Sequence, residues 1–544
     1  DGTANQTASK ITVNVAGDIT MIAEGGRGGS GWGERGYRNS VQIGHGGWDS
    51  DFKANQNMAS FTWWGDIDPD NALTSNPLDP NDFNPKSPLG DQSDLNNYAG
   101  DADSGLHPLT PVISVNGEGK AILNQATLLG TTGDVEVTAG GDITVSSFDA
   151  TRLATQQGNG NTYWGVEATA MIGNGGYAVD GDHVGNVTAH AGGALTFTAT
   201  QGVATQVERS TVQLGNGGYA SRGMHSGIID AMAGAGGISF LGGDHTQNYA
   251  MLGHGGWDSD APNNPPLGTV DGHSGNISVL TTDGGDVIFQ ASVGTSSFVQ
   301  LGHGGSHTRT NHSGDISVVS DGKVRFAAGT GTSAAWGDPN TAHETYAQLG
   351  HGGRENDGNH SGDIKVRAKN QLELIASQSA LRGFAQIGHG GERANGSQTG
   401  DISVVVGSGT SIIQSGQDGF GHESYAQIGQ GGFGASNGNK TGNVEFITTD
   451  GGDLNIFSSN NGANGNSYVQ IGNGGTSLNG ADVLSGNVTV IVDGELSLER
   501  GANSELRIGN RGATLGAGDL TVLADSIDFD STATDNLLVI TNQV

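Results

Sequence analysis

Residues 346–366 read Y-A-Q-L-G-H-G-G-R-E-N-D-G-N-H-S-G-D-I-K-V, and two phrases within this stretch return along the chain. The first phrase has eight positions: an aromatic residue; Ala or Val; Gln; Ile or Leu; Gly; His or Asn; Gly; and Gly. The second phrase has six positions: a small residue; Gly; Asp or Asn; Ile or Val; any residue; and Val or Phe. Both recur at intervals of about 42 residues, and such a period is typical of a solenoid, a propeller or a repeat array.

Each repeat contains three short runs in which apolar and polar residues alternate, and glycine-rich turns separate them. Period-two alternation with β-branched residues is the pattern of a strand. The sequence therefore predicts an all-β protein built as a right-handed parallel β-helix, a β-solenoid of about 10–12 coils with three strands each. A propeller is the rival architecture, but its blades need four strands. The side chains expected to point inward are Ala347, Leu349, Ile364, Val366, Leu372 and Leu374.

The repeat is interrupted once. We expect solenoid coils in residues 1–47, an insertion rich in Asp, Pro and Trp in residues 48–111, and solenoid repeats in residues 112–544. Neither end shows a polar cap, and uncovered strand edges pair with other chains. The sequence therefore predicts self-association end to end, unless the segment belongs to a longer solenoid.

The composition limits the classes of partner. Asp and Glu number 56 against 23 Lys and Arg, for a net charge of −33, and this excess repels nucleic acids and anionic membranes. The chain has no Cys, which excludes disulfides and thiol chemistry. No apolar run approaches the roughly 18 residues that cross a bilayer, so we expect no membrane span in this segment.

Histidines gather at two positions of the repeat. One follows the first Gly of the first phrase, and the other precedes the Ser or Thr of the second phrase. Stacked imidazoles at a rung spacing offer nitrogen ligands to a transition metal. The alternative is a structural ladder, because Asn and Gln replace His at the first position. The candidate metal ligands are His303, His312, His351 and His360, and the ladder residues are His254, His303, His351 and His389.

A column of glutamines is expected beside the aromatic residues of the first phrase. Stacked identical coils produce amide and aromatic ladders, so we interpret this column as structural. Its members are Gln300, Gln348, Gln386, Gln427 and Gln470.

The insertion carries two further candidate sites. Asp66, Asp68 and Asp70 have the one-three-five oxygen spacing of a calcium loop, although the Gly and Glu that complete such a loop are missing. No cofactor is required, and calcium is the candidate ion for this loop. Phe61, Trp63 and Trp64 offer a sugar-stacking platform or a subunit contact, or else form a small core of the insertion.

No G-x-S-x-G, H-E-x-x-H or phosphate-loop motif occurs, so we predict that the protein is not an enzyme. The repeated G-(D/N)-(I/V)-x-(V/F) strands with glycine turns resemble the filamentous-haemagglutinin-like adhesins and autotransporter passenger domains of secreted bacterial exoproteins. The N-P-N-G signature of the two-partner secretion domain is missing. The resemblance implies a β-helix displayed outside a bacterial cell that binds through its loops.

We therefore expect an extracellular or cell-surface protein that acts as an adhesin or as a structural subunit of an extracellular fibre or biofilm matrix. Its expected partners are further copies of itself, a host or neighbouring cell surface, or a glycan. The alternative function is that of a polysaccharide-binding or polysaccharide-degrading β-helix protein of the lyase or hydrolase type, because abundant carboxylates offer pairs that could flank a glycosidic bond.

Overall fold

The computed structural model describes most of the repeat region of the chain. The described residues are 10–23, 40–45, 113–115, 121–123, 131–147, 165–166, 168–179, 181–200, 207–259, 271–329, 344–377, 382–416, 423–459, 467–478, 483–512, 514–531 and 538–540. In these ranges the regular structure is entirely β, and no helix is long and apolar enough to cross a membrane.

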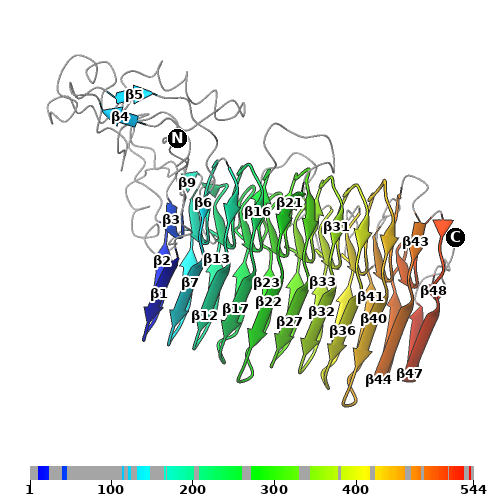
Figure 1. The fold of residues 1–544 in the computed structure, drawn as a ribbon. Helices are drawn as coiled ribbons and strands as arrows, with labels where there is room; N and C mark the ends of the chain where they lie inside the picture. Colours follow the sequence, from blue (N-terminus) through cyan, green and yellow to red (C-terminus); the bar gives the residue numbers. More distant parts are fainter. Residues whose placement is uncertain are drawn as a thin grey trace, which may run out of the picture.

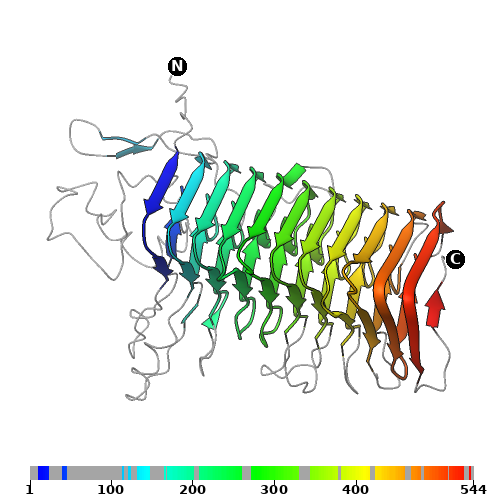
Figure 2. The same ribbon diagram turned by 90° about the horizontal axis from the view of Figure 1, so that it is seen from below.

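The described strands stack as the coils of a parallel β-helix (Figures 1 and 2). One coil consists of β32 (Ile364–Ala368), β33 (Leu372–Ile375), β34 (Phe384–Ile387) and the two-residue strand β35 (Gln398–Thr399). Each strand pairs in parallel with its equivalent in the neighbouring coils, and the strands form sheets of 20, 11 and 10 strands. The predicted β-solenoid is confirmed, with a short strand added to the three main strands of each coil.

The inner faces of the coils form one continuous apolar core. Along β32 alternate side chains are buried, because successive residues of a strand point to opposite faces. All six side chains that we expected to point inward lie in this core. Phe197, Phe240, Phe289 and Phe326 stack in one column, with ring centroids 4.6–4.8 Å apart. Burial of each such side chain contributes about 1.5–3 kcal/mol, and stacking of the coils completes that burial.

The strands of the first phrase are buried on both faces. In β29 (Tyr346–Leu349), Ala347 and Leu349 enter the main core, whereas Tyr346 packs into a second apolar cluster on the other side of the sheet. The second cluster also contains Trp257 and Phe433, which lie in the segments that follow the Gly-Gly of their coils. The glycine-rich segment therefore folds back over this sheet and covers it.

The stack continues directly across the insertion. β1 (Ile11–Val15) pairs with β7 (Val135–Ala139), and β3 (Ser40–Ile43) pairs with β10 (Thr169–Ile172). The long segment between residues 45 and 131 is therefore an excursion from one coil. β6 (Thr131–Thr132) is the first strand after this segment that joins the stack.

Two described strands follow the predicted boundary at residue 112 and lie outside the three large sheets. β4 (Ile113–Val115) and β5 (Ala121–Leu123) pair antiparallel in a two-stranded sheet of their own (Figure 1). A hairpin strand and a solenoid strand share the same alternating pattern, so the sequence alone did not distinguish them.

Candidate functional site

The first histidine column is held by backbone hydrogen bonds on both ring nitrogens. The backbone N–H of His254 donates to Nδ1 of His303 at 3.0 Å, and Nε2 of His303 donates to the carbonyl oxygen of Gly275 at 2.7 Å. Because Nδ1 accepts a hydrogen bond, the ring is neutral and carries its proton on Nε2. His351 repeats both contacts one coil further along. These nitrogens are therefore already engaged and offer no lone pair to a metal.

Amide side chains make the same two contacts in this column. Oε1 of Gln430 accepts from the backbone N–H of His389 at 2.8 Å, and its Nε2 donates to the carbonyl of Gly400 at 2.8 Å. Oδ1 of Asn473 likewise accepts from the N–H of Gln430, while its Nδ2 donates to a glycine carbonyl. His, Asn and Gln interchange because each provides one acceptor and one donor in the required directions.

Burial keeps the imidazoles of this column neutral. The rings stack with centroids 4.7 Å apart, and their side chains are fully buried. Burial lowers the pKa of His254 and that of His389 to about 4, because a charged ring would lose its hydration.

The second histidine column runs beside the first and is also buried. Its members are His183, His225, His273, His312 and His360. Burial lowers the pKa of His273 and of His360 to about 3. Nε2 of His312 lies 2.9 Å from Oγ1 of Thr308. Within the described ranges no group of three His, Asp or Glu side chains is arranged to hold a metal ion.

The glutamine column joins successive coils through glycine carbonyls. Nε2 of Gln348 donates to the carbonyl oxygens of Gly388 and Gly390 in the next coil, at 3.0 and 3.1 Å. Tyrosine hydroxyls reach the amide oxygens, as where Tyr468 donates to Gln427 at 3.0 Å. All five glutamines named above are buried. These contacts are those of a structural ladder.

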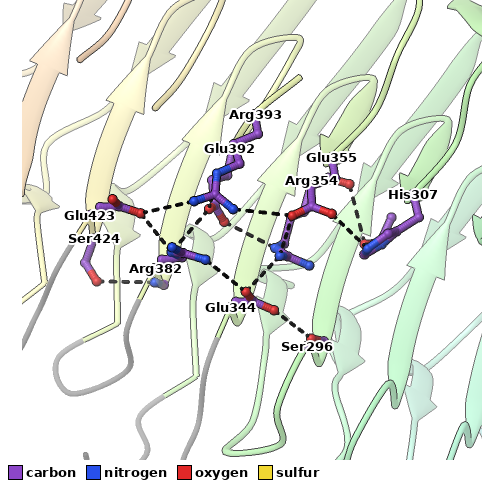
Figure 3. Close-up of polar contacts among 12 residues, drawn as sticks. Ser296, His307, Glu344, Arg354, Glu355, Arg382, Glu392, Arg393, Glu423 and Ser424 are labelled. Carbon is purple, nitrogen blue, oxygen red and sulfur yellow. Dashed lines mark hydrogen bonds and ion pairs between the residues drawn. The ribbon is translucent and has the colours of Figure 1, made fainter. Parts of the chain in front are cut away.

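A cluster of charged side chains occupies the corner beside the second apolar cluster (Figure 3). We call it the charged corner. It consists of Glu344, Arg354, Glu355, Arg382, Glu392, Arg393 and Glu423, with His307 and Ser296 at its edge. The residues come from neighbouring coils, and opposite charges alternate along the stack.

Arg354 and Arg382 connect the coils at this corner. Arg354 lies 2.7 Å from Glu344 and 2.7 Å from Glu355. Arg382 lies 3.3 Å from Glu344 and 2.8 Å from Glu423. Arg354 is only 6% exposed, and a desolvated guanidinium with carboxylate partners on two sides fixes their positions more firmly than a surface pair does.

Glu392 lies at the centre of the charged corner. Its buried carboxylate is 3.3 Å from Arg354, 3.8 Å from Arg382 and 3.7 Å from Arg393. Neither of its oxygens accepts a hydrogen bond from a described residue. Burial consequently raises the pKa of Glu392 to about 7, although the three arginines oppose this rise. The pKa of Glu355, at the edge of the charged corner, shifts in the opposite direction, since the hydrogen bond from His307 lowers it to about 2.

The charged corner holds the points at which variable segments rejoin the stack. Glu344, Arg382 and Glu423 each stand just before an aromatic strand, and the connection that precedes each of them differs in length from coil to coil. All three adopt positive φ angles of 58–69°, a strained conformation that persists only where surrounding contacts enforce it. The cluster was not predicted, although the reversed pairs Arg354-Glu355 and Glu392-Arg393 at one repeat position were a usable signal.

The candidate sites of the insertion lie outside the described residues. These are the calcium candidates Asp66, Asp68 and Asp70 and the aromatic candidates Phe61, Trp63 and Trp64. Both hypotheses therefore stay predictions.

Comparisons with protein-family models, with curated proteins and with solved structures find no match for this chain.

Proposed function

We propose that the protein is an extracellular, non-enzymatic β-solenoid that acts as a surface adhesin, a rigid rod that presents binding segments from its side. The observation that carries this proposal is the charged corner. It fixes the ends of connections that vary in length, whereas the aromatic strands that follow them keep the same register from coil to coil. Function concentrates in loops that a rigid scaffold positions.

The insertion is the first binding candidate. It leaves the stack between β3 and β6, and the coils on either side of it pair directly. Its removal should therefore leave the solenoid intact. The net charge of −33 favours cationic or uncharged partner surfaces over anionic ones.

The test is a variant in which a short Gly-Ser linker replaces residues 48–111. Binding to cultured cells and to immobilised glycans is measured for this variant and for the full chain, and circular dichroism reports the fold. A matched control shortens the 330–343 connection instead. We expect the first variant to lose binding with an unchanged spectrum. Full binding by the 48–111 deletion would overturn the assignment to the insertion, and release of sugars from a polysaccharide panel by the full chain would favour the lyase or hydrolase alternative.

A second candidate function is that of a fibre subunit. Ile527 and Phe529 of β47 (Leu520–Ser531) occupy inward positions, as their register with β44 (Val488–Arg500) shows, yet they are 44% and 51% exposed. We propose that a coil of a second copy covers them. Negative-stain microscopy of the chain at high concentration would then show filaments that Phe529→Asp abolishes, and only monomers in both samples would contradict the proposal.

A further inference from the structure

The centre of the charged corner lies at a repeat position that other coils fill with aromatic side chains. This position directly follows the Gly-Gly of the first phrase. Its occupants in successive coils are Tyr177, Tyr219, Trp257, Ser306, Arg354, Glu392, Phe433 and Thr476. The aromatic members belong to the second apolar cluster, and Arg354 and Glu392 are as buried as they are. Two charged groups therefore stand where neighbouring coils bury a ring.

The two charged groups face each other without a hydrogen bond. Nε of Arg354 lies 3.3 Å from a carboxylate oxygen of Glu392, yet neither this nitrogen nor either oxygen has a hydrogen-bond partner among the described residues. A buried, ionised carboxylate without such bonds has lost its hydration and gains little in return. An apolar side chain at this position would often be as stabilising or more so. What the carboxyl adds instead is a response to protonation.

Charged groups face Glu392 from every neighbouring element (Figure 3). They are Arg354 at the end of β30 (Gly352–Arg354), Glu344 before β29, Arg382 before β34, Glu423 before β38 (Tyr425–Ile428), and Glu355 and Arg393 just after the Gly-Gly position. The hydroxyl of Tyr425 also lies nearby, but burial raises its pKa well above the usual value, so it stays neutral. The ring of His307 contacts Glu355.

The corner has one carboxylate more than it has guanidiniums. Each arginine keeps another partner when Glu392 is neutral: Arg354 keeps Glu344 and Glu355, Arg382 keeps Glu344 and Glu423, and Arg393 lies 3.5 Å from Glu355. Glu392 is thus the surplus negative charge, and it is the carboxylate with the least access to water. Its proton can come and go while the other ion pairs persist.

We propose that Glu392 is a proton-operated latch of the charged corner, closed while its carboxyl is protonated and loosened when it ionises. In the closed corner a neutral carboxyl fits among buried side chains at little cost. Once ionised, the carboxylate regains its hydration only if the corner opens to water. The latch is a property of the scaffold, and it does not depend on which surface the protein binds.

The direction of the pH effect follows from the raised pKa of Glu392. Burial raises this pKa to about 7 against the arginines, whereas the ordinary value is 4.5. Between these values the closed corner holds more protons than an open one, so opening becomes more favourable as the pH rises and levels off above pH 7. The buried histidine columns have the opposite sign, because their lowered pKa values make opening more favourable in acid.

The latch acts on backbone that is already strained. Glu344, Arg382 and Glu423 hold positive φ angles where the variable connections rejoin the stack, and their ion pairs help to enforce that conformation. Opening of the corner would weaken these contacts in three successive coils. Local opening of this kind does not require the rest of a repeat array to unfold.

The test is hydrogen exchange of the full chain at pH 6 and pH 8, with protection factors corrected for intrinsic exchange. Peptides covering residues 344–357, 382–395 and 423–434 report the corner. We expect their protection to fall roughly tenfold from pH 6 to pH 8 in wild type. Glu392→Gln keeps the shape of a neutral carboxyl and should remove this fall. The control His307→Asn removes the titratable ring at the edge of the corner and should retain it.

Infrared difference spectra of wild type between the same two pH values give a second measurement that needs no variant. We expect the band of a protonated carboxyl at pH 6 to disappear at pH 8. Equal protection of wild type at the two pH values, or a persistent pH dependence in Glu392→Gln, would disprove the latch. Absence of the carboxyl band at pH 6 would do the same, and loss of the pH dependence in His307→Asn would assign the effect to His307 instead.

Discussion

The substitution His389→Asn should make the protein more resistant to acid. Nδ1 of His389 accepts the backbone N–H of His351 at 3.0 Å, and its Nε2 donates to Gly362 at 2.8 Å. Protonation of Nδ1 would turn that acceptor into a donor facing another donor. Asn provides the same acceptor and donor without a titratable group, as Asn473 does further along the column.

The size of the effect follows from the pKa of the buried ring. Burial lowers the pKa of His389 to about 4, whereas an unfolded histidine titrates near 6.5. The unfolded chain therefore binds more protons between these values, and stability falls as the pH decreases through this window. At pH 5 this histidine costs about 2 kcal/mol relative to pH 7.5. Asp363 and Asp315 raise the pKa slightly, and the nearby ring of His360 is itself neutral.

Equilibrium unfolding by urea, followed by circular dichroism at pH 7.5 and pH 5, measures this difference. Hydrogen exchange of peptides around residues 384–391 reports the same coil locally, because repeat arrays can unfold in parts. We expect the loss of stability between the two pH values to be about 2 kcal/mol smaller in His389→Asn than in wild type. The control Gln430→Asn exchanges one amide for another in the same column and should keep the wild-type loss. An identical pH dependence in wild type and His389→Asn would refute the reasoning.

Four further substitutions test the packing, and thermal or chemical unfolding measures each. Gly302→Ala places a Cβ 2.0 Å from a backbone oxygen at a φ of +148° and should lower the free energy of unfolding by roughly 3 kcal/mol or more. Gly284→Ala has a φ of +86° but open space around its Cβ, so it should cost about 1–2 kcal/mol. Similar losses in the two variants would contradict the argument that close approach of the backbone requires Gly302. Gln348→Ala leaves the carbonyl of Gly388 without its donor, whereas the carbonyl of Gly390 keeps the N–H of Gly353, so the variant should cost about 1–3 kcal/mol and a neutral result would exclude the ladder role. Phe289→Ala opens a cavity between two stacked phenylalanines and should cost about 3–5 kcal/mol, and a loss below about 1 kcal/mol would show that the column is not tightly packed.

The strands and the core were predictable because both depend on local alternation and on the repeat period. Ile364 and Val366 are apolar at alternate positions in a strand, and this places both in the core without knowledge of the rest of the chain. The two hydrogen bonds of His303 to neighbouring coils agree with the interchange of His, Asn and Gln at this position, since the three side chains share one acceptor and one donor.

The charged corner depends on which coils become neighbours. Arg354 meets Glu392 only because one repeat separates them in the stack, and the varying repeat length hides this proximity in the linear sequence.

The shared chemistry of the first histidine column also bears on how the length of such a rod evolves. Each coil offers a backbone N–H to the column side chain of the next coil, and His303, Gln430 and Asn473 all accept it. Duplication or loss of a whole coil would therefore leave every remaining junction with compatible partners. Gain or loss of a single residue within a strand would instead turn its inward side chains outward. The rod can thus lengthen or shorten by whole coils during evolution, while the spacing within each coil stays under strict selection.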